Sequence, residues 1–82
     1  QILNIYPNPT NGKAYINTDE TMYGDMEIQI MDILGKTINT QIIKNTQPNQ
    51  TILIDLKNKA TGVYIIQALI GDKVWEGKLV VE

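Results

Sequence analysis

The sequence predicts an all-β fold, a sandwich or small barrel of seven short antiparallel strands. No stretch of about 11 residues repeats apolar side chains with helical spacing. Short runs rich in β-branched residues instead alternate with turn-forming residues, which is typical of small sandwiches. The 82 residues are enough for one domain. We expect strands at residues 2–6, 13–17, 26–32, 37–43, 51–56, 63–70 and 73–81.

The last two predicted strands form a hairpin around Gly71-Asp72. A two-residue turn with glycine first favours type II′, although type I′ stays open. The register that follows places small residues opposite large ones on a single face, which we interpret as the core. These pairs are Ala68 with Trp75, Ile66 with Gly77, and Tyr64 with Leu79.

The turn around Leu34-Gly35 gives a different expectation. A two-residue loop would pair Ile28 and Ile30 with polar side chains, which would make a poor core. The polar partners would be Gln41 and Asn39, whereas a loop of three or five residues would supply Ile42, Thr40 or Ile38. We therefore predict a loop of odd length with Gly35 at a positive φ. The polar segments 18–25 and 44–50 are expected to be surface loops.

The amino-acid composition argues against most kinds of catalytic and metal-binding site. The chain has no histidine and no cysteine, which removes the usual general base, the usual nucleophile pairs and most transition-metal ligands. A net charge of -2 and scattered lysines argue against nucleic acid as a partner, and no apolar run is long enough for membrane insertion. We expect no enzyme activity, no cofactor and no metal. The acidic segment 19–25 lacks calcium-loop spacing, and a solvated turn explains it better.

Four short motifs punctuate the chain in order: Tyr6-Pro7-Asn8-Pro9-Thr10-Asn11-Gly12, Met31-Asp32-Ile33-Leu34-Gly35-Lys36, Thr61-Gly62-Val63-Tyr64-Ile65-Ile66, and the terminal Gly77-Lys78-Leu79-Val80-Val81-Glu82. The prolines lack an N–H and hold their predecessors extended, which ends the first strand. Asn11-Gly12 then turns the chain into the next strand.

This ordered set, with Ile-Asp-Leu at 54–56, resembles the C-terminal sorting domain of type IX secretion cargo in Bacteroidota, and the resemblance covers essentially the whole chain. It implies an immunoglobulin-like sandwich of seven strands in which residues 1–82 form the single C-terminal secretion signal of a larger exported protein. The implied partners are the type IX translocon, an outer-membrane barrel shuttle protein and a sortase-like cysteine peptidase. The parent would pass through the periplasm and then be released or joined to an anionic lipopolysaccharide at the cell surface.

The resemblance carries over residue by residue. Pro7, Asn8, Pro9 and Gly12 match the first family motif; Asp32, Gly35 and Lys36 match the second; Gly62 and Tyr64 match the third. Lys78, Leu79, Val80 and Val81 match the terminal strand, which together with Glu82 we expect to be the element recognised by the translocon or shuttle. Relatives often end on a basic residue, so Glu82 puts in doubt any contact that needs a final positive charge. Backbone conformation alone would explain Gly12, Gly35 and Gly62.

The outward face of the last strand, with Val74, Glu76, Lys78 and Val80, is more apolar than a fully solvated face should be. We hypothesise that this face, or the free edge of the strand, docks the secretion machinery. A weak dimer through open edge strands stays open. The main alternative is an immunoglobulin-like spacer or carbohydrate-binding module of a secreted enzyme. Such a module should expose a row of aromatic side chains, but Tyr64 and Trp75 are expected in the core.

Overall fold

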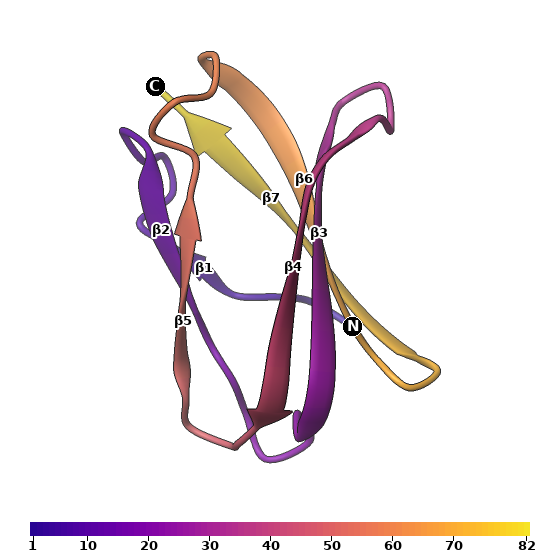
Figure 1. The fold of residues 1–82 in the computed structure, drawn as a ribbon. Coiled ribbons are helices and arrows are strands. Elements are labelled where there is room, and N and C mark those ends of the chain that lie inside the picture. The colour runs from indigo at the N-terminus through magenta and orange to yellow at the C-terminus, as the bar shows by residue number, and fades with distance from the viewer.

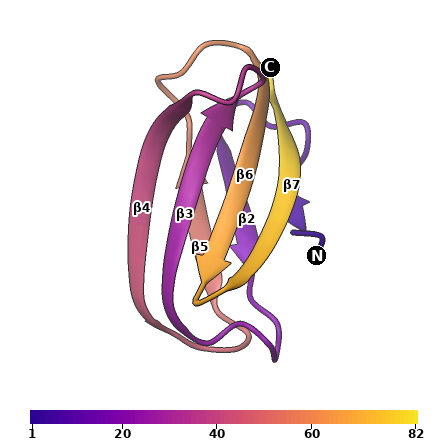
Figure 2. The same cartoon turned by 90° about the vertical axis from the view of Figure 1, so that its right-hand side faces the viewer.

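The computed structural model describes all 82 residues and contains two antiparallel sheets packed face to face (Figures 1 and 2). One sheet has the order β1-β2-β5 and is formed by β1 (Ile5–Tyr6), β2 (Lys13–Asn17) and β5 (Thr51–Asp55). The other has the order β4-β3-β6-β7 and is formed by β3 (Gly24–Asp32), β4 (Thr37–Thr46), β6 (Gly62–Ile70) and β7 (Lys73–Val81). The predicted seven-stranded immunoglobulin-like sandwich is confirmed. No helix long and apolar enough to cross a membrane is present.

Strand bounds agree with the sequence prediction to within one or two residues, except at the start of the first strand and at the end of β4. β3 begins at Gly24, inside the predicted loop 18–25. The first strand is predicted from residue 2, but continuous pairing is limited to Ile5 and Tyr6, and Ile2 makes only an isolated bridge to Glu76. β4 continues to Thr46, so the polar connection to β5 is shorter than predicted. The Oγ1 of buried Thr18 accepts a hydrogen bond from the Gln50 amide at 2.7 Å and so anchors this connection.

The hairpin of β6 and β7 is confirmed in full. Its register pairs Ala68 with Trp75, Ile66 with Gly77, and Tyr64 with Leu79. Gly71 has φ 59°, whereas Asp72 is not among the residues with positive φ. A type I′ turn would need positive φ at both positions, so the turn is type II′.

The predicted register of β3 and β4 is wrong. Ile28 and Ile30 do lie opposite Gln41 and Asn39, across a four-residue loop followed by a bulge between Ile30 and Met31. The prediction assumed that both strands lie over the core. β4 is in fact an edge strand that extends past the three-stranded sheet, so its inward side chains line an open, largely polar hollow of about 350 Å³ beside β5. The positive φ of Gly35, 85°, is as predicted.

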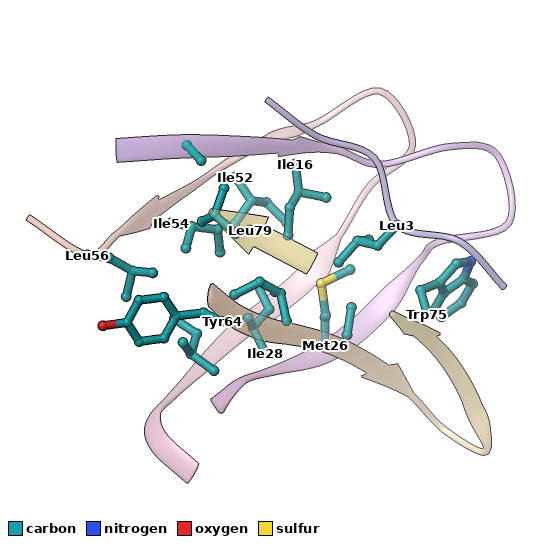
Figure 3. Close-up of a cluster of buried hydrophobic side chains, with 14 of the residues drawn as sticks. Leu3, Ile16, Met26, Ile28, Ile52, Ile54, Leu56, Tyr64, Trp75 and Leu79 are labelled. Carbon is teal, nitrogen blue, oxygen red and sulfur yellow. The ribbon is translucent and has the colours of Figure 1, made fainter. Parts of the chain in front are cut away.

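The core lies between the sheets and draws on both (Figure 3). Ile16, Ile52 and Ile54 project from the three-stranded sheet toward Ile28 and Met26 of the other. Trp75 and Tyr64 close opposite ends of this layer. The five residues predicted for the inner face are all buried, namely Tyr64, Ile66, Ala68, Trp75 and Leu79. Leu3 and Met22, which lie outside the strands, are also buried and were not predicted.

Candidate functional site at one end of the sandwich

The four sequence motifs meet at one end of the sandwich, which we call the motif end: residues 7–12, 32–36, 57–64 and 78–82. Two rows of strand pairing bring them together. Asp32 lies opposite Tyr64, which lies opposite Leu79, and Gly62 lies opposite Val81, which bridges to Thr10. Figures 1 and 2 show the C-terminus and the β3–β4 and β5–β6 loops at the same end. Segments up to 72 residues apart in sequence therefore form one surface.

The first motif is joined to the last strand by the side chain of Asn8. Its Nδ2 donates to the Lys78 carbonyl at 2.8 Å, and its Oδ1 accepts from the Val80 amide at 3.0 Å. Pro7 and Pro9 cannot donate from the backbone, so the carboxamide of Asn8 supplies the donor and acceptor that a neighbouring strand would otherwise supply. Both bonds that precede these prolines, Tyr6-Pro7 and Asn8-Pro9, are cis.

Thr10 and Gly12 fix the rest of this motif. The Thr10 amide donates to the Val80 carbonyl at 2.8 Å, and the Glu82 amide donates to the Thr10 carbonyl at 2.8 Å. Gly12 has φ 140°, and a Cβ at this position would lie 2.9 Å from the Lys57 Cα. Glycine is required here for conformation and for close approach, so the role of Gly12 is structural.

The second motif is a loop organised by Asp32. Its Oδ1 accepts from the amides of Leu34 and Lys36 at 2.9 and 3.0 Å, and its own amide donates to the Lys36 carbonyl. The Gly35 amide donates to the Asp32 carbonyl, and the positive φ of Gly35 allows the backbone to turn there. Asp32 and Gly35 thus hold the backbone, while the side chain of Lys36 is exposed.

The third motif contains a tyrosine corner. The hydroxyl of Tyr64 donates to the Ala60 carbonyl four residues upstream, and the ring is buried. This contact at the start of the penultimate strand is a hallmark of immunoglobulin-like sandwiches. Tyr64 therefore stabilises the fold and the β5–β6 loop, and it is not available as a contact for a partner.

The terminal strand divides by face. Leu79 and Val81 are core residues, whereas Lys78, Val80 and Glu82 are exposed or half-buried. The edge of β7 is not free, contrary to the alternative in which a partner adds a strand there. Gln1 and Leu3 form backbone hydrogen bonds with Glu76, and Asn8 and Thr10 cover the edge from residue 78 to 82. The outward face is the part of β7 that a partner can reach.

Charge is unevenly distributed along the sandwich. Five of the seven lysines lie at or beside the motif end, namely Lys13, Lys36, Lys57, Lys59 and Lys78. Six of the nine acidic residues lie in the opposite half or at mid-height, namely Asp19, Glu20, Asp25, Glu27, Asp72 and Glu76. The one ion pair, Lys44 with Asp25 at 3.2 Å, is also in the opposite half. The motif end is therefore the basic part of an acidic protein.

The acidic segment considered for calcium uses its carboxylates internally. Asp19 accepts hydrogen bonds from the hydroxyl and amide of Thr21, which lower the pKa of Asp19. The Asn45 amide, followed by the Lys44 ammonium group, lowers the pKa of Asp25. No three acidic side chains gather as a metal site would require.

The exposed aromatic residues do not form a platform for sugar rings. Tyr6 and Tyr15 are neighbours across β1 and β2, with ring centroids 6.0 Å apart and planes tilted by 38°. Tyr23 lies in the loop before β3. A tilted pair without a third coplanar ring gives no support to the carbohydrate-binding alternative.

The sequence identified the four motifs but predicted neither that they meet at one end of the sandwich nor how their residues interact. The Asn8 carboxamide contacts and the covering of β7 by residues 1–10 were not predicted. The available signal was the position of Asn8 between two prolines. Because Pro7 and Pro9 have no backbone N–H to donate, a side chain has to supply the hydrogen bonds that join this segment to the sheet.

A comparison with known families gives the context for this geometry. Residues 4–82 match the family model described as the secretion system C-terminal sorting domain. The matched region includes all four motifs and both sheets. No match was found among the curated proteins.

Proposed function

The chain belongs to the family of secretion system C-terminal sorting domains. We propose that it is the sorting signal by which the type IX translocon recognises its parent protein. Membership implies an exported parent, delivered to the cell surface or the extracellular space, and an interaction with the secretion machinery. The family is one of sorting signals and not of catalysts, and the lack of enzyme activity in this chain stays a prediction.

The finer steps are part of the proposal. Residues 1–82 form the C-terminal domain of a larger protein that passes through the periplasm. An outer-membrane barrel shuttle protein receives the folded domain, and a sortase-like cysteine peptidase then removes it. The cargo is released or joined to anionic lipopolysaccharide.

The observation that carries this proposal is the convergence of the four motifs on the end of the sandwich where the last strand ends. Core packing alone would not require the loop at 32–36, the prolines at 7 and 9 and the terminal strand to share one end. Most motif residues hold backbone in place, and the side chains left outward on the terminal strand are Lys78, Val80 and Glu82. We propose that these three positions of the segment 78–82 contact the translocon or shuttle, while Leu79 and Val81 hold the strand in the core.

The experiment fuses the 82 residues to the C-terminus of a periplasmic reporter in a Bacteroidota strain. We expect most of the reporter outside the cell, compared with retention of the same reporter without the domain. Equal retention of both proteins would contradict the sorting function.

A second arm of this experiment tests the terminal strand. Val80→Asp should lower export, whereas Val74→Asp, on the same face near the other end of β7, should not. Truncation of residues 78–82 is a poor test, because it also removes core residues Leu79 and Val81. Normal export of a folded Val80→Asp variant would remove the terminal strand from the recognition surface.

A further inference from the structure

The outer face of the four-stranded sheet carries two apolar patches separated by a polar row. Strand pairing places Thr40, Gln29, Gln67 and Glu76 in one line across all four strands. On the side of the motif end lie Met31, Ile65, Val63 and Val80, which we call the upper patch. On the opposite side lie Ile42, Leu69 and Val74, which we call the lower patch.

The upper patch continues into the β3–β4 loop. Met31 is followed closely by Ile33 and Leu34, whose side chains are 71% and 89% exposed. Asp32 holds the loop backbone through two side-chain hydrogen bonds, so these side chains are presented on a fixed turn. Fixing two neighbouring large apolar side chains in water has no benefit for the core. Of the upper patch itself, Val63 is exposed and the other three residues are half-buried, so the loop tip is its most exposed part. Exposed apolar side chains held in this way are typical of interaction sites.

The two patches differ in the charges beside them. Lys78 lies in the row of Met31 and Ile65, and Lys36 lies in the adjoining loop; neither forms an ion pair. The lower patch adjoins Glu27, which accepts from Gln29 at 2.5 Å, and Asp25, which pairs with Lys44. The upper patch therefore has two unpaired cations beside it, with Glu82 at the end of the same strand. The lower patch has one unpaired cation, Lys73, together with the carboxylates of Glu27 and Asp25.

We propose that the upper patch, the loop tip of Ile33 and Leu34, and the ammonium groups of Lys36 and Lys78 dock a protein of the secretion machinery whose contact surface has an apolar centre and a rim of carboxylates. This proposal rests on the proposed function and extends its recognition surface from β7 across β6 and β3. An apolar centre with a polar rim is the usual anatomy of a protein interface. Carboxylates facing the unpaired lysines would add specificity and a faster association rate.

The test uses the reporter fusion with two pairs of substitutions and matched controls. Ile33→Ser with Leu34→Ser removes the apolar tip, and Lys36→Glu with Lys78→Glu reverses the rim. The controls are Ile42→Ser with Val74→Ser on the lower patch, and Lys44→Glu with Lys73→Glu for charge. Each test pair should reduce the exported fraction at least about tenfold, and each control pair should stay within about twofold of the wild type. Urea midpoints of the purified fusions establish that all variants are folded.

The outcomes separate the surface from the sorting function. If the wild-type domain exports the reporter and folded upper-patch variants export it equally well, the docking surface is wrong and the sorting function stands. Equal loss in the upper-patch and lower-patch variants would also overturn the assignment, because it would show a general sensitivity of this face. If the wild-type domain does not export the reporter, both proposals fail.

Two alternative partners for the upper patch, a second copy of the domain and an anionic lipid surface, are tested with the purified fusion. Light scattering measures whether it dimerises, and cosedimentation measures binding to phosphatidylcholine vesicles with and without phosphatidylglycerol. We expect a monomer that binds neither vesicle. Dimerisation lost in the Ile33→Ser, Leu34→Ser variant would assign the surface to a second copy, and vesicle binding lost in Lys36→Glu, Lys78→Glu would assign it to an anionic lipid surface. Either result would overturn the protein partner.

Discussion

Among single residues, Asn8 has the contact least expected from its surroundings. It stands between two prolines, and its carboxamide bonds to the Lys78 carbonyl and the Val80 amide as a peptide group would. Sequence reasoning assigned the prolines correctly to the end of a strand. It could not assign Asn8, because asparagine between prolines is equally suited to a turn. The contact is visible only in the structure, because the fold brings Asn8 next to Lys78, which is 70 residues later in the sequence.

Replacement of Asn8 tests this interaction. Asn8→Ala leaves one backbone donor and one acceptor of β7 without their partner, and we expect it to lower the free energy of unfolding by about 1–2 kcal/mol. Urea denaturation measures the change. Asn58→Ala is the matched control, because Asn58 is exposed in a loop at the same end. Equal midpoints for the two variants would show that the carboxamide contributes nothing to stability.

At the scale of elements, the N-terminal segment and β7 are fitted to each other. Gly77 has no positive φ, so its conformation does not require glycine. A Cβ there would lie 2.7 Å from the Leu3 carbonyl oxygen and 3.0 Å from Ile5 Cδ1. The missing side chain of Gly77 thus leaves the space in which the N-terminal segment packs against β7. This segment also covers an edge that would otherwise be open to other strands. The remaining edge strands, through which a dimer could form, are β4, β5 and the two-residue β1.

A coupled pair of changes tests this fit. Gly77→Ala should destabilise the domain by about 1–3 kcal/mol through overpacking, with faster hydrogen exchange at the Leu3 and Glu76 amides. The same substitution should cost at least about 1 kcal/mol less after deletion of residues 1–3, because the colliding carbonyl is then absent. An unchanged cost in the shortened chain would show that the clash lies elsewhere.

A bulge in β4, where Lys44 and Asn45 lie opposite Asp25 of β3, makes the stability of this strand pair depend on pH. Asp25 lies at a register shift and accepts from the amide of Asn45, which has φ 53°. Its lowered pKa means that the folded state favours the carboxylate. The associated stability is present above the ordinary value of 3.8 and is lost as pH falls below it. Asp19 acts in the same direction.

Urea midpoints measured between about pH 5 and pH 2 test this linkage. The wild-type midpoint should fall as pH drops below the ordinary carboxylate range. The variant Asp19→Asn with Asp25→Asn should be less stable at neutral pH and should show a smaller fall, because two of the groups that take up protons on unfolding are gone. The same slope in both proteins would contradict the assigned cause.

The hairpins show how far the elements follow from sequence. The β6–β7 register was predictable because both strands lie over the core and a two-residue turn fixes their parity. The β3–β4 register was not, because β4 is an edge strand whose inward side chains Asn39 and Gln41 face an open hollow. Period-2 patterning gives the face of a strand only where that face is buried.

At the scale of the whole molecule, the motif end brings together positions that the sequence shows only as separate motifs. Glycine, proline, Asp32 and Tyr64 hold the loops and the terminal strand, while Ile33, Leu34 and the lysines remain outward. The sequence was sufficient for the family and the fold class. It was not sufficient for the docking surface, since exposure of the upper patch depends on which face of four strands is left uncovered.

The most direct test of the central claim compares export in two strains that differ only in the type IX translocon. The reporter fused to the 82 residues should appear outside cells that have the translocon and accumulate in the periplasm of cells that lack it. The reporter without the domain should remain periplasmic in both. Export of the fusion at the same level in both strains, or in neither, would contradict the conclusion that this domain is a type IX sorting signal.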